Sequence, residues 1–225
     1  MLHPYYYFSF ESTLLASLFE EDMVLDVLKK LSSYFKKQKL GKIDISLPEN
    51  VYLENPHLIS IGEGTIIEPG VYIKGPVIIG KNCEIRHGAY IRENVILGDE
   101  VVIGHNSEIK HSILLPRSHV AHFNYVGDSI LGSDTNLGAG VICANFRLDG
   151  KEIFIRLKEK KEGTGLRKLG VILGDGSKIG CNSVINPGTL IGKDVLCPAG
   201  IVLSGSISSK ARIISQRMYS IEEEN

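Results

Sequence analysis

Residues 61–115 read IGEGTIIEPGVYIKGPVIIGKNCEIRHGAYIRENVILGDEVVIGHNSEIKHSILL. An aliphatic residue returns at every sixth position of this stretch, and the same interval resumes after two irregular segments. A period of six fits neither the 3.6-residue repeat of an α-helix nor the alternation of an ordinary strand. It is typical of a β-helix in which each side of a coil is one short strand. The predicted inward-facing residues are Ile61, Ile67, Ile73, Ile79, Ile85, Ile91, Leu97, Ile103, Ile109, Leu115, Leu131, Leu137, Cys143, Leu173, Ile179, Ile185, Ile191, Cys197 and Leu203.

This pattern resembles the hexapeptide-repeat family. The resemblance implies an all-β solenoid, namely a left-handed parallel β-helix of triangular cross-section. Three hexads then make one coil, so residues 18 apart stack, and about twenty hexads give about seven coils. We assign residues 46–208 to this β-helix, with a loop excursion at 149–170. Because each coil contacts only its neighbours, the ends of the stack need caps.

The segment 1–45 that precedes the repeats carries apolar residues at helical spacing. We predict a short N-terminal helical segment that caps the β-helix or packs in a trimer, with binding to a partner protein as the alternative. The polar residues 209–225 are expected to form a C-terminal tail. The apolar positions are Leu14, Leu15, Leu18, Phe19, Val24, Leu28, Leu31 and Phe35.

Composition excludes several classes of protein. The 225 residues include 25 Lys+Arg and 26 Asp+Glu, and a net charge of -1 argues against a nucleic-acid partner. Apolar residues make up 43 %, enough for a core, but no uncharged run approaches the roughly 18 residues that span a bilayer. The first residues lack the features of a signal peptide. The four cysteines are far apart, so we expect a cytoplasmic protein with reduced thiols and no membrane partner.

A column of cations is predicted on one side of the β-helix. Lys74, Arg92 and Lys110 each follow an inward aliphatic residue and are 18 residues apart. Stacked like charges destabilise neighbouring strands. An anion between Arg92 and Lys110 would relieve the repulsion, and Arg suits phosphate; alternatively, the long side chains splay into water. A regular repeat needs no irregularity for stability, so we expect the chemistry at the breaks near 119–128 and 136–169.

Two segments carry a more specific resemblance. HFNYVGDSILGSDTNLGAGVICANFRLDGK (122–151) resembles the acetyltransferase domain of the bifunctional UDP-N-acetylglucosamine pyrophosphorylase/glucosamine-1-phosphate N-acetyltransferase family. GTGLRKLGVILGDGSKIGCNSVINPGTLIG (163–192) is similar to the archaeal-type sugar-1-phosphate nucleotidylyltransferases. The resemblance implies only the acetyl-transfer half: N-acetylation of glucosamine 1-phosphate or galactosamine 1-phosphate by acetyl-CoA, feeding UDP-N-acetylhexosamine synthesis, in a homotrimer.

The resemblance also implies roles for individual residues. His122 corresponds to the catalytic base, and acetyl-CoA is expected to lie between neighbouring subunits. Phe146 stands where the bacterial family has tyrosine, and Cys181 stands at a serine position. The implied acceptor-binding residues are Arg92, Lys110, Tyr125, Asn136 and Lys151, and the implied acetyl-CoA-binding residues are Ala139, Asn145, Phe146, Cys181 and Ala199.

The chemistry fits these residue types, since a neutral imidazole can accept the proton that an amine loses during attack on a thioester. No metal site is predicted: His87 and His105 should stack, but the paired histidines of the zinc-binding γ-class carbonic anhydrases are missing. Two alternatives remain, a catalytically weak scaffold that partners a separate nucleotidyltransferase, and a nucleotide-linked or hydroxyl acceptor. The basic excursion either contacts the phosphates of coenzyme A or grips a neighbouring subunit.

Overall fold

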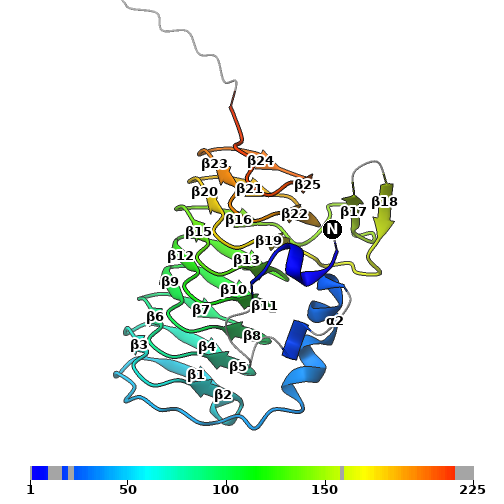
Figure 1. Cartoon of the computed structure of the whole chain (residues 1–225). Helices are drawn as coiled ribbons and strands as arrows, with labels where there is room; N and C mark the ends of the chain where they lie inside the picture. The colour runs from blue at the N-terminus through cyan, green and yellow to red at the C-terminus, as the bar shows by residue number, and fades with distance from the viewer. Residues whose placement is uncertain (1, 10–16, 20–22, 158–159, 216–225) are drawn as a thin grey trace, which may run out of the picture.

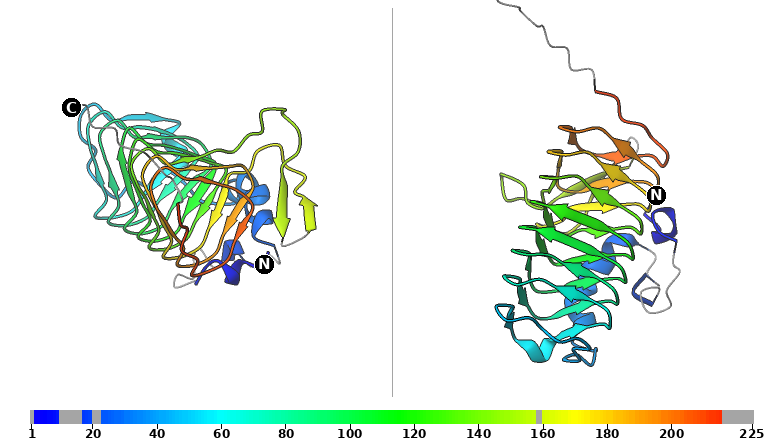
Figure 2. Two further views of the ribbon diagram at one scale, coloured as in Figure 1. Left: turned by 90° about the horizontal axis from the view of Figure 1, so that it is seen from above. Right: turned by 90° about the vertical axis from the view of Figure 1, so that its left-hand side faces the viewer.

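The computed structural model describes residues 2–9, 17–19, 23–157 and 160–215. Three parallel sheets wind around a common axis as a left-handed β-helix (Figure 1). Seen from above, the coils lie over one another as a three-sided tube (Figure 2). The predicted fold class is therefore confirmed. The sheets hold eight, eight and seven strands, so the stack is slightly taller than the expected seven coils.

Each sheet takes no more than one strand from a coil, and we name the three sheets A, B and C. Sheet A contains β2 (Ile59–Ile61), β5 (Val77–Ile79), β8 (Val95–Leu97), β11 (Ser112–Leu114), β14 (Ile130–Leu131), β19 (Val171–Leu173), β22 (Thr189–Ile191) and β25 (Ser206–Ile207). Sheet B contains β1 (Tyr52–Glu54), β4 (Tyr72–Lys74), β7 (Tyr90–Ile91), β10 (Glu108–Lys110), β13 (Tyr125–Gly127), β16 (Ile142–Cys143), β21 (Val184–Ile185) and β24 (Val202–Leu203). Sheet C contains β3 (Ile66–Ile67), β6 (Glu84–Ile85), β9 (Val102–His105), β12 (His119–His122), β15 (Asn136–Leu137), β20 (Lys178–Ile179) and β23 (Leu196–Cys197).

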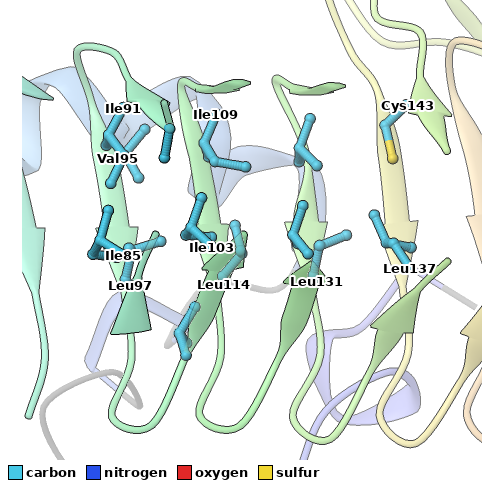
Figure 3. Close-up of a cluster of buried hydrophobic side chains, with 14 of the residues drawn as sticks. Ile85, Ile91, Val95, Leu97, Ile103, Ile109, Leu114, Leu131, Leu137 and Cys143 are labelled. Atoms are coloured by element: carbon cyan, nitrogen blue, oxygen red, sulfur yellow. The ribbon is translucent and has the colours of Figure 1, made fainter. Parts of the chain in front are cut away.

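The core is the stack of inward aliphatic side chains (Figure 3). Every predicted inward residue except Leu115 belongs to this cluster, each at most 7 % exposed. Leu114 takes the predicted place of Leu115, because it pairs with Leu97 below and Leu131 above. The prediction for Leu115 is therefore wrong by one residue.

The shift arises from two short coils. The inward residues Ile109 and Leu114 are five positions apart, as are Val126 and Leu131, so the coils repeat after 17 residues there. A buried serine tightens each of these corners. The Ser112 hydroxyl donates to the carbonyl of Lys110 at 2.8 Å and accepts the amide of Ser129 at 3.0 Å. The expected break at 119–128 is therefore absent, and the β-helix continues through it.

The second expected break is a real excursion. Between β16 and β19 the chain leaves the β-helix and forms an antiparallel hairpin, β17 (Phe154–Leu157) and β18 (Lys160–Gly163). The hairpin lies beside β22 and β25 (Figure 1). Ile155 of the hairpin and Ile153, which precedes it, join residues on the outer face of sheet A in one buried cluster.

The N-terminal segment contains η1 (Pro4–Tyr6), η2 (Ser17–Phe19) and α2 (Val24–Phe35), and η3 (Pro56–Leu58) follows β1. The predicted helix is present, although Leu14 and Leu15 lie outside the described residues. It lies along the flank of the solenoid rather than over an end (Figure 1). The reason is that the middle residues of the sheet A strands face outward and are apolar. Those residues, which share a buried cluster with α2, are Ile96, Ile113, Ile130, Ile172 and Leu190.

The β-helix extends slightly beyond the predicted limits of 46–208. A bridge pairs Ile43 with Ile61 at one end, and another pairs Leu196 with Arg212 at the other. The predicted C-terminal tail therefore begins with residues that still follow the coil, and residues 216–225 lie outside the described part of the chain.

Candidate active site

The predicted column of cations exists on the outer face of sheet B. Strand pairing aligns Lys74 with Glu54 and places Arg92 and Lys110 after paired residues of β7 and β10. On the next coil the same position is Gly127, which pairs with Lys110 and ends the run of cations. Arg92 and Lys110 therefore lie on adjacent coils of one side of the prism, as predicted.

Each cation of this column is paired with a carboxylate of the chain. Lys74 lies 3.3 Å from Glu54, the Arg92 guanidinium 2.8 Å from Glu108, and Lys110 3.1 Å from Asp128. Carboxylates of the same chain therefore compensate the stacked positive charges. The two arrangements considered from the sequence were a bound anion and side chains that splay into water. The two pairs nearest Gly127 differ in exposure. The side chains of Arg92 and Glu108 are 32 % and 35 % exposed, but those of Lys110 and Asp128 only 14 % and 9 %.

Tyr125 and Asn145 complete a polar cluster over Gly127. A Cβ on Gly127 would lie 2.5 Å from Asn145 Nδ2 and 2.6 Å from the Tyr125 hydroxyl, so only glycine leaves room for both groups. Asn145 donates a short hydrogen bond to Asp128. Burial, followed by the negative charges of Asp128 and Glu108, raises the pKa of Tyr125. The Tyr125 hydroxyl is therefore a protonated hydrogen-bond donor near neutral pH.

His122 stands at the corner where sheet C turns into sheet B. Its side chain is exposed, its amide donates to Asn124 Oδ1 at 3.0 Å, and Tyr125 begins the next strand. The side chains of His122 and Tyr125 therefore flank one corner. Arg92 and Lys110 lie at the opposite end of the sheet B strands, so sheet B connects the imidazole with the cations.

A strip of small residues rises from His122 along the same corner. The amide of Gly140 donates to the carbonyl of His122 at 2.9 Å, that of Asn182 to Ala139 at 2.8 Å and that of Gly200 to Cys181 at 2.7 Å. This ladder stacks Ala139, Cys181 and Ala199 above His122, one on each successive coil. Three of the five predicted acetyl-CoA positions thus form a continuous line, and the Cys181 thiol is exposed.

The other predicted site residues lie elsewhere on this chain. Asn136 is on sheet C, paired with His119 and Lys178. Phe146 is 44 % exposed and lines a cleft of about 620 Å³. Lys151 is also exposed, and its amide donates to Asp149 at 3.2 Å. The chain therefore carries three separate groups of predicted residues, on sheet B with its corner, on sheet C, and on the excursion.

The histidines below His122 stack as predicted. The rings of His87 and His105 lie 5.5 Å apart with an interplanar angle of 13°, and Phe123 packs edge-on against His105. The Nδ1 atoms of His87 and His105 lie 2.6 Å and 2.9 Å from carbonyl oxygens of the coil below. Within the described ranges, no three or more His, Cys, Asp or Glu side chains are grouped to hold a metal ion.

The sequence interpretation missed Glu108 and Asp128. A signal existed for Glu108, which stands two residues before Lys110 and therefore shares its face of the strand. A signal existed for Asp128 as well, because a fixed period of 18 places it in the column beside Lys110; the short coil pairs Lys110 with Gly127 instead, and the Asp128 carboxylate reaches Lys110 from the next position. No helix of the described chain is long and apolar enough to cross a membrane.

Comparisons with known proteins confirm the expected resemblance. Residues 73–159 match the model of the GMPPB C-terminal domain. The chain is 37 % identical over 94 residues to a bifunctional sugar-1-phosphate nucleotidylyltransferase/acetyltransferase of Sulfurisphaera tokodaii, which covers 42 % of this chain and 23 % of that relative. It is 29 % identical over 164 residues to the bifunctional protein GlmU of Synechococcus sp., covering 73 % and 29 % of the two chains.

A UDP-N-acetylglucosamine acyltransferase structure from Campylobacter jejuni is 15 % identical, with coverage of 76 % and 70 % and a TM-score of 0.41. The chain spans between about a quarter and three tenths of the length of the curated relatives described above. It is therefore similar to one part of bifunctional proteins, one of which is named as an acetyltransferase.

Proposed function

We propose that this chain transfers an acetyl group from acetyl-CoA to the amine of an amino-sugar 1-phosphate, either glucosamine 1-phosphate or galactosamine 1-phosphate. One observation carries the proposal. His122 and Tyr125 flank a corner from which sheet B leads to Arg92 and Lys110, and all four residues lie within the segment 73–159 that matches the GMPPB C-terminal domain, in a chain similar to a relative whose name includes an acetyltransferase. The product would feed the synthesis of a UDP-N-acetylhexosamine.

In this proposal the exposed imidazole of His122 is the general base. The neutral ring takes a proton from the acceptor amine while the amine nitrogen attacks the thioester carbon. The tetrahedral intermediate then expels the thiolate of coenzyme A, which recovers the proton. A positioned base of this kind contributes about 10²–10⁴-fold to the rate.

Arg92 is the cation best suited to exchange its partner for the acceptor phosphate. Its pair with Glu108 is about one-third exposed, and such pairs are worth about 1 kcal/mol or less. A phosphate that binds arginine bidentately can therefore compete with the Glu108 carboxylate. Lys110 is held more firmly, because its pair with Asp128 is largely buried. We assign Lys110 and the protonated Tyr125 hydroxyl to positioning the sugar phosphate.

Acetyl-CoA is proposed to lie along the strip formed by Ala139, Cys181 and Ala199. Small side chains on successive coils leave space for the thin pantetheine arm beside His122. Asn145, Phe146, Asn136 and Lys151 would complete the two binding sites. Because Asn136 lies on sheet C and Arg92 on sheet B, one ligand contacts both most simply at an interface between copies. We therefore propose a homotrimer.

The rival role is a weak scaffold that binds a separate nucleotidyltransferase through the N-terminal helix. The helix gives that role no support, since its apolar residues are already buried against sheet A. An acceptor with a hydroxyl or a nucleotide remains a rival that an acceptor panel distinguishes.

The test is release of the coenzyme A thiol with glucosamine 1-phosphate, galactosamine 1-phosphate and UDP-linked amino sugars as acceptors. We expect turnover with an amino-sugar 1-phosphate and a loss of about 10²–10⁴-fold in kcat for His122→Ala. His57→Ala is the matched control, because His57 is an exposed histidine on η3, between β1 and β2 at the lower end of the β-helix, whereas His122 precedes β13. Undiminished turnover in His122→Ala would contradict the assignment. Absence of turnover with every acceptor, with recovery of a nucleotidyltransferase in a pull-down, would favour the scaffold.

A further inference from the structure

A second cleft lies between the hairpin and the upper coils. It has a volume of about 410 Å³. Strand β17 forms one wall, and the corner between β24 and β25, residues 204–206, forms the other. The hairpin stands against this part of sheet A (Figure 1). The Ser206 hydroxyl donates a short hydrogen bond to the carbonyl of Arg156, and this bond links the hairpin to the corner at residues 204–206.

Two cations stand directly opposite each other on the wall made by the hairpin. Arg156 pairs with Lys161 across the two strands, and both side chains are exposed and line the cleft. Like charges at directly opposed positions destabilise a strand pair. The Lys161 ammonium lies 4.6 Å from the centre of the Phe154 ring, which holds it over the same face.

The charge of the cleft differs from that of the sheet B cluster. Its lining contains the two cations and no carboxylate among the described residues. The nearby acids do not line the cleft: Glu152 Oε1 accepts the amide of Gly165 at 2.7 Å, and Glu162, which pairs with Ile155, is not among the lining residues. Arg92 and Lys110, by contrast, each have a carboxylate partner within 3.1 Å.

We propose that this cleft is a binding site for a phosphate group, with Arg156 and Lys161 as its cationic ligands. The bound anion would offset the repulsion between the opposed cations, and arginine binds phosphate bidentately. The Ser204 side chain is exposed at the rim and offers a hydroxyl. The backbone of Gly205 has a φ of +80° and open space where a Cβ would stand, so the ligand can approach the main chain closely.

The cleft is distant from the sheet B cluster, and it shares Phe154 and Pro187 with the cleft that Phe146 lines. Ser204 belongs to the same column as Lys110, which continues through Gly127, Ala144 and Asn186. Four steps of about 4.8 Å place it roughly 19 Å higher along the β-helix. The phosphate could belong to coenzyme A or to a free nucleotide, and its recognition here does not depend on the proposed acetyl transfer.

Calorimetric titration with inorganic pyrophosphate tests the proposal. All proteins carry Arg92→Gln, which removes the cation proposed to bind the acceptor phosphate and so weakens any binding at the sheet B cluster. We expect Arg156→Gln/Lys161→Gln to weaken pyrophosphate binding by about tenfold or more. Lys160→Gln is the matched control, because Lys160 is a neighbouring lysine that does not line the cleft, and we expect less than about a twofold change. Equal thermal midpoints would show that all variants are folded.

The proposal is overturned if pyrophosphate does not bind, or if Lys160→Gln weakens binding as much as the double variant, since hairpin charge alone would then suffice. Parallel titrations with coenzyme A, 3′-dephospho-coenzyme A and UDP identify the source of the phosphate. If the double variant binds only coenzyme A more weakly, the cleft binds its 3′-phosphate. If the double variant binds all three ligands more weakly by the same factor, the cleft binds a diphosphate. If the double variant binds only pyrophosphate more weakly, the ligand is a free anion.

Discussion

Replacing Leu31 with alanine tests whether α2 is an integral layer of the fold. Leu31 is 0 % exposed and belongs to the cluster that joins α2 to the outer face of sheet A. Truncation of a buried leucine costs about 2–5 kcal/mol through lost transfer energy and the remaining cavity. A value of about 3 kcal/mol corresponds to a fall of about 6–12 °C in Tm for a chain of this size. Urea unfolding and calorimetry would measure both quantities.

Two further variants make this test specific. Ser32→Ala changes the exposed side of the same helix, so we expect an effect within about 0.5 kcal/mol. Ile113→Ala truncates the sheet side of the cluster, and its effect should not add to that of Leu31→Ala, with a coupling of about 0.5 kcal/mol or more. A loss below about 1 kcal/mol for Leu31→Ala, with full additivity, would refute the packing of α2 on sheet A.

Two other predictions concern charge and thiol reactivity. Asp128→Asn leaves the largely buried Lys110 without its counter-charge and should lower the free energy of unfolding by about 3 kcal/mol. Glu108→Gln changes a pair that is one-third exposed and should lower it by about 1 kcal/mol or less. Equal losses of the two variants in urea unfolding would contradict the difference in burial. Burial raises the pKa of Cys83 to about 11 and that of Cys143 to about 12. Since the thiolate is the reactive form, a disulfide reagent at pH 8 should modify exposed Cys181 first, and Cys181→Ser should abolish that fast phase.

The sequence was sufficient to predict most of the core, because the stacking of equivalent residues imposes a period that the chain must keep. It misplaced Leu115 because a corner can lose one residue when a serine hydroxyl replaces the packing of a larger side chain, as Ser112 does opposite Val95. A search at fixed period interprets such a corner as a break. The helix was predictable from its own apolar spacing, but its location depended on the outward residues of sheet A, such as Ile113, which the period of six does not identify.

The candidate site was predictable where it depends on stacking alone. The alignment of Arg92 with Lys110 and of His87 with His105 follows from the length of a coil. The spacing places Glu108 and Asp128 near these cations, but which carboxylate pairs with which cation depends on side-chain conformation, which the spacing does not show. Whether Asn136 and Arg92 contact one ligand depends on how copies assemble, which a single chain does not encode as a pattern.

The lining of sheet A by α2 and the hairpin has a consequence for assembly. A triangular prism has three walls, and here one wall is already occupied by the chain's own N-terminal segment and excursion. A ring of three prisms joined wall to wall uses two walls of each member. The lined wall therefore sets the orientation of every copy in such a ring, because sheets B and C are the two that remain to face a neighbour.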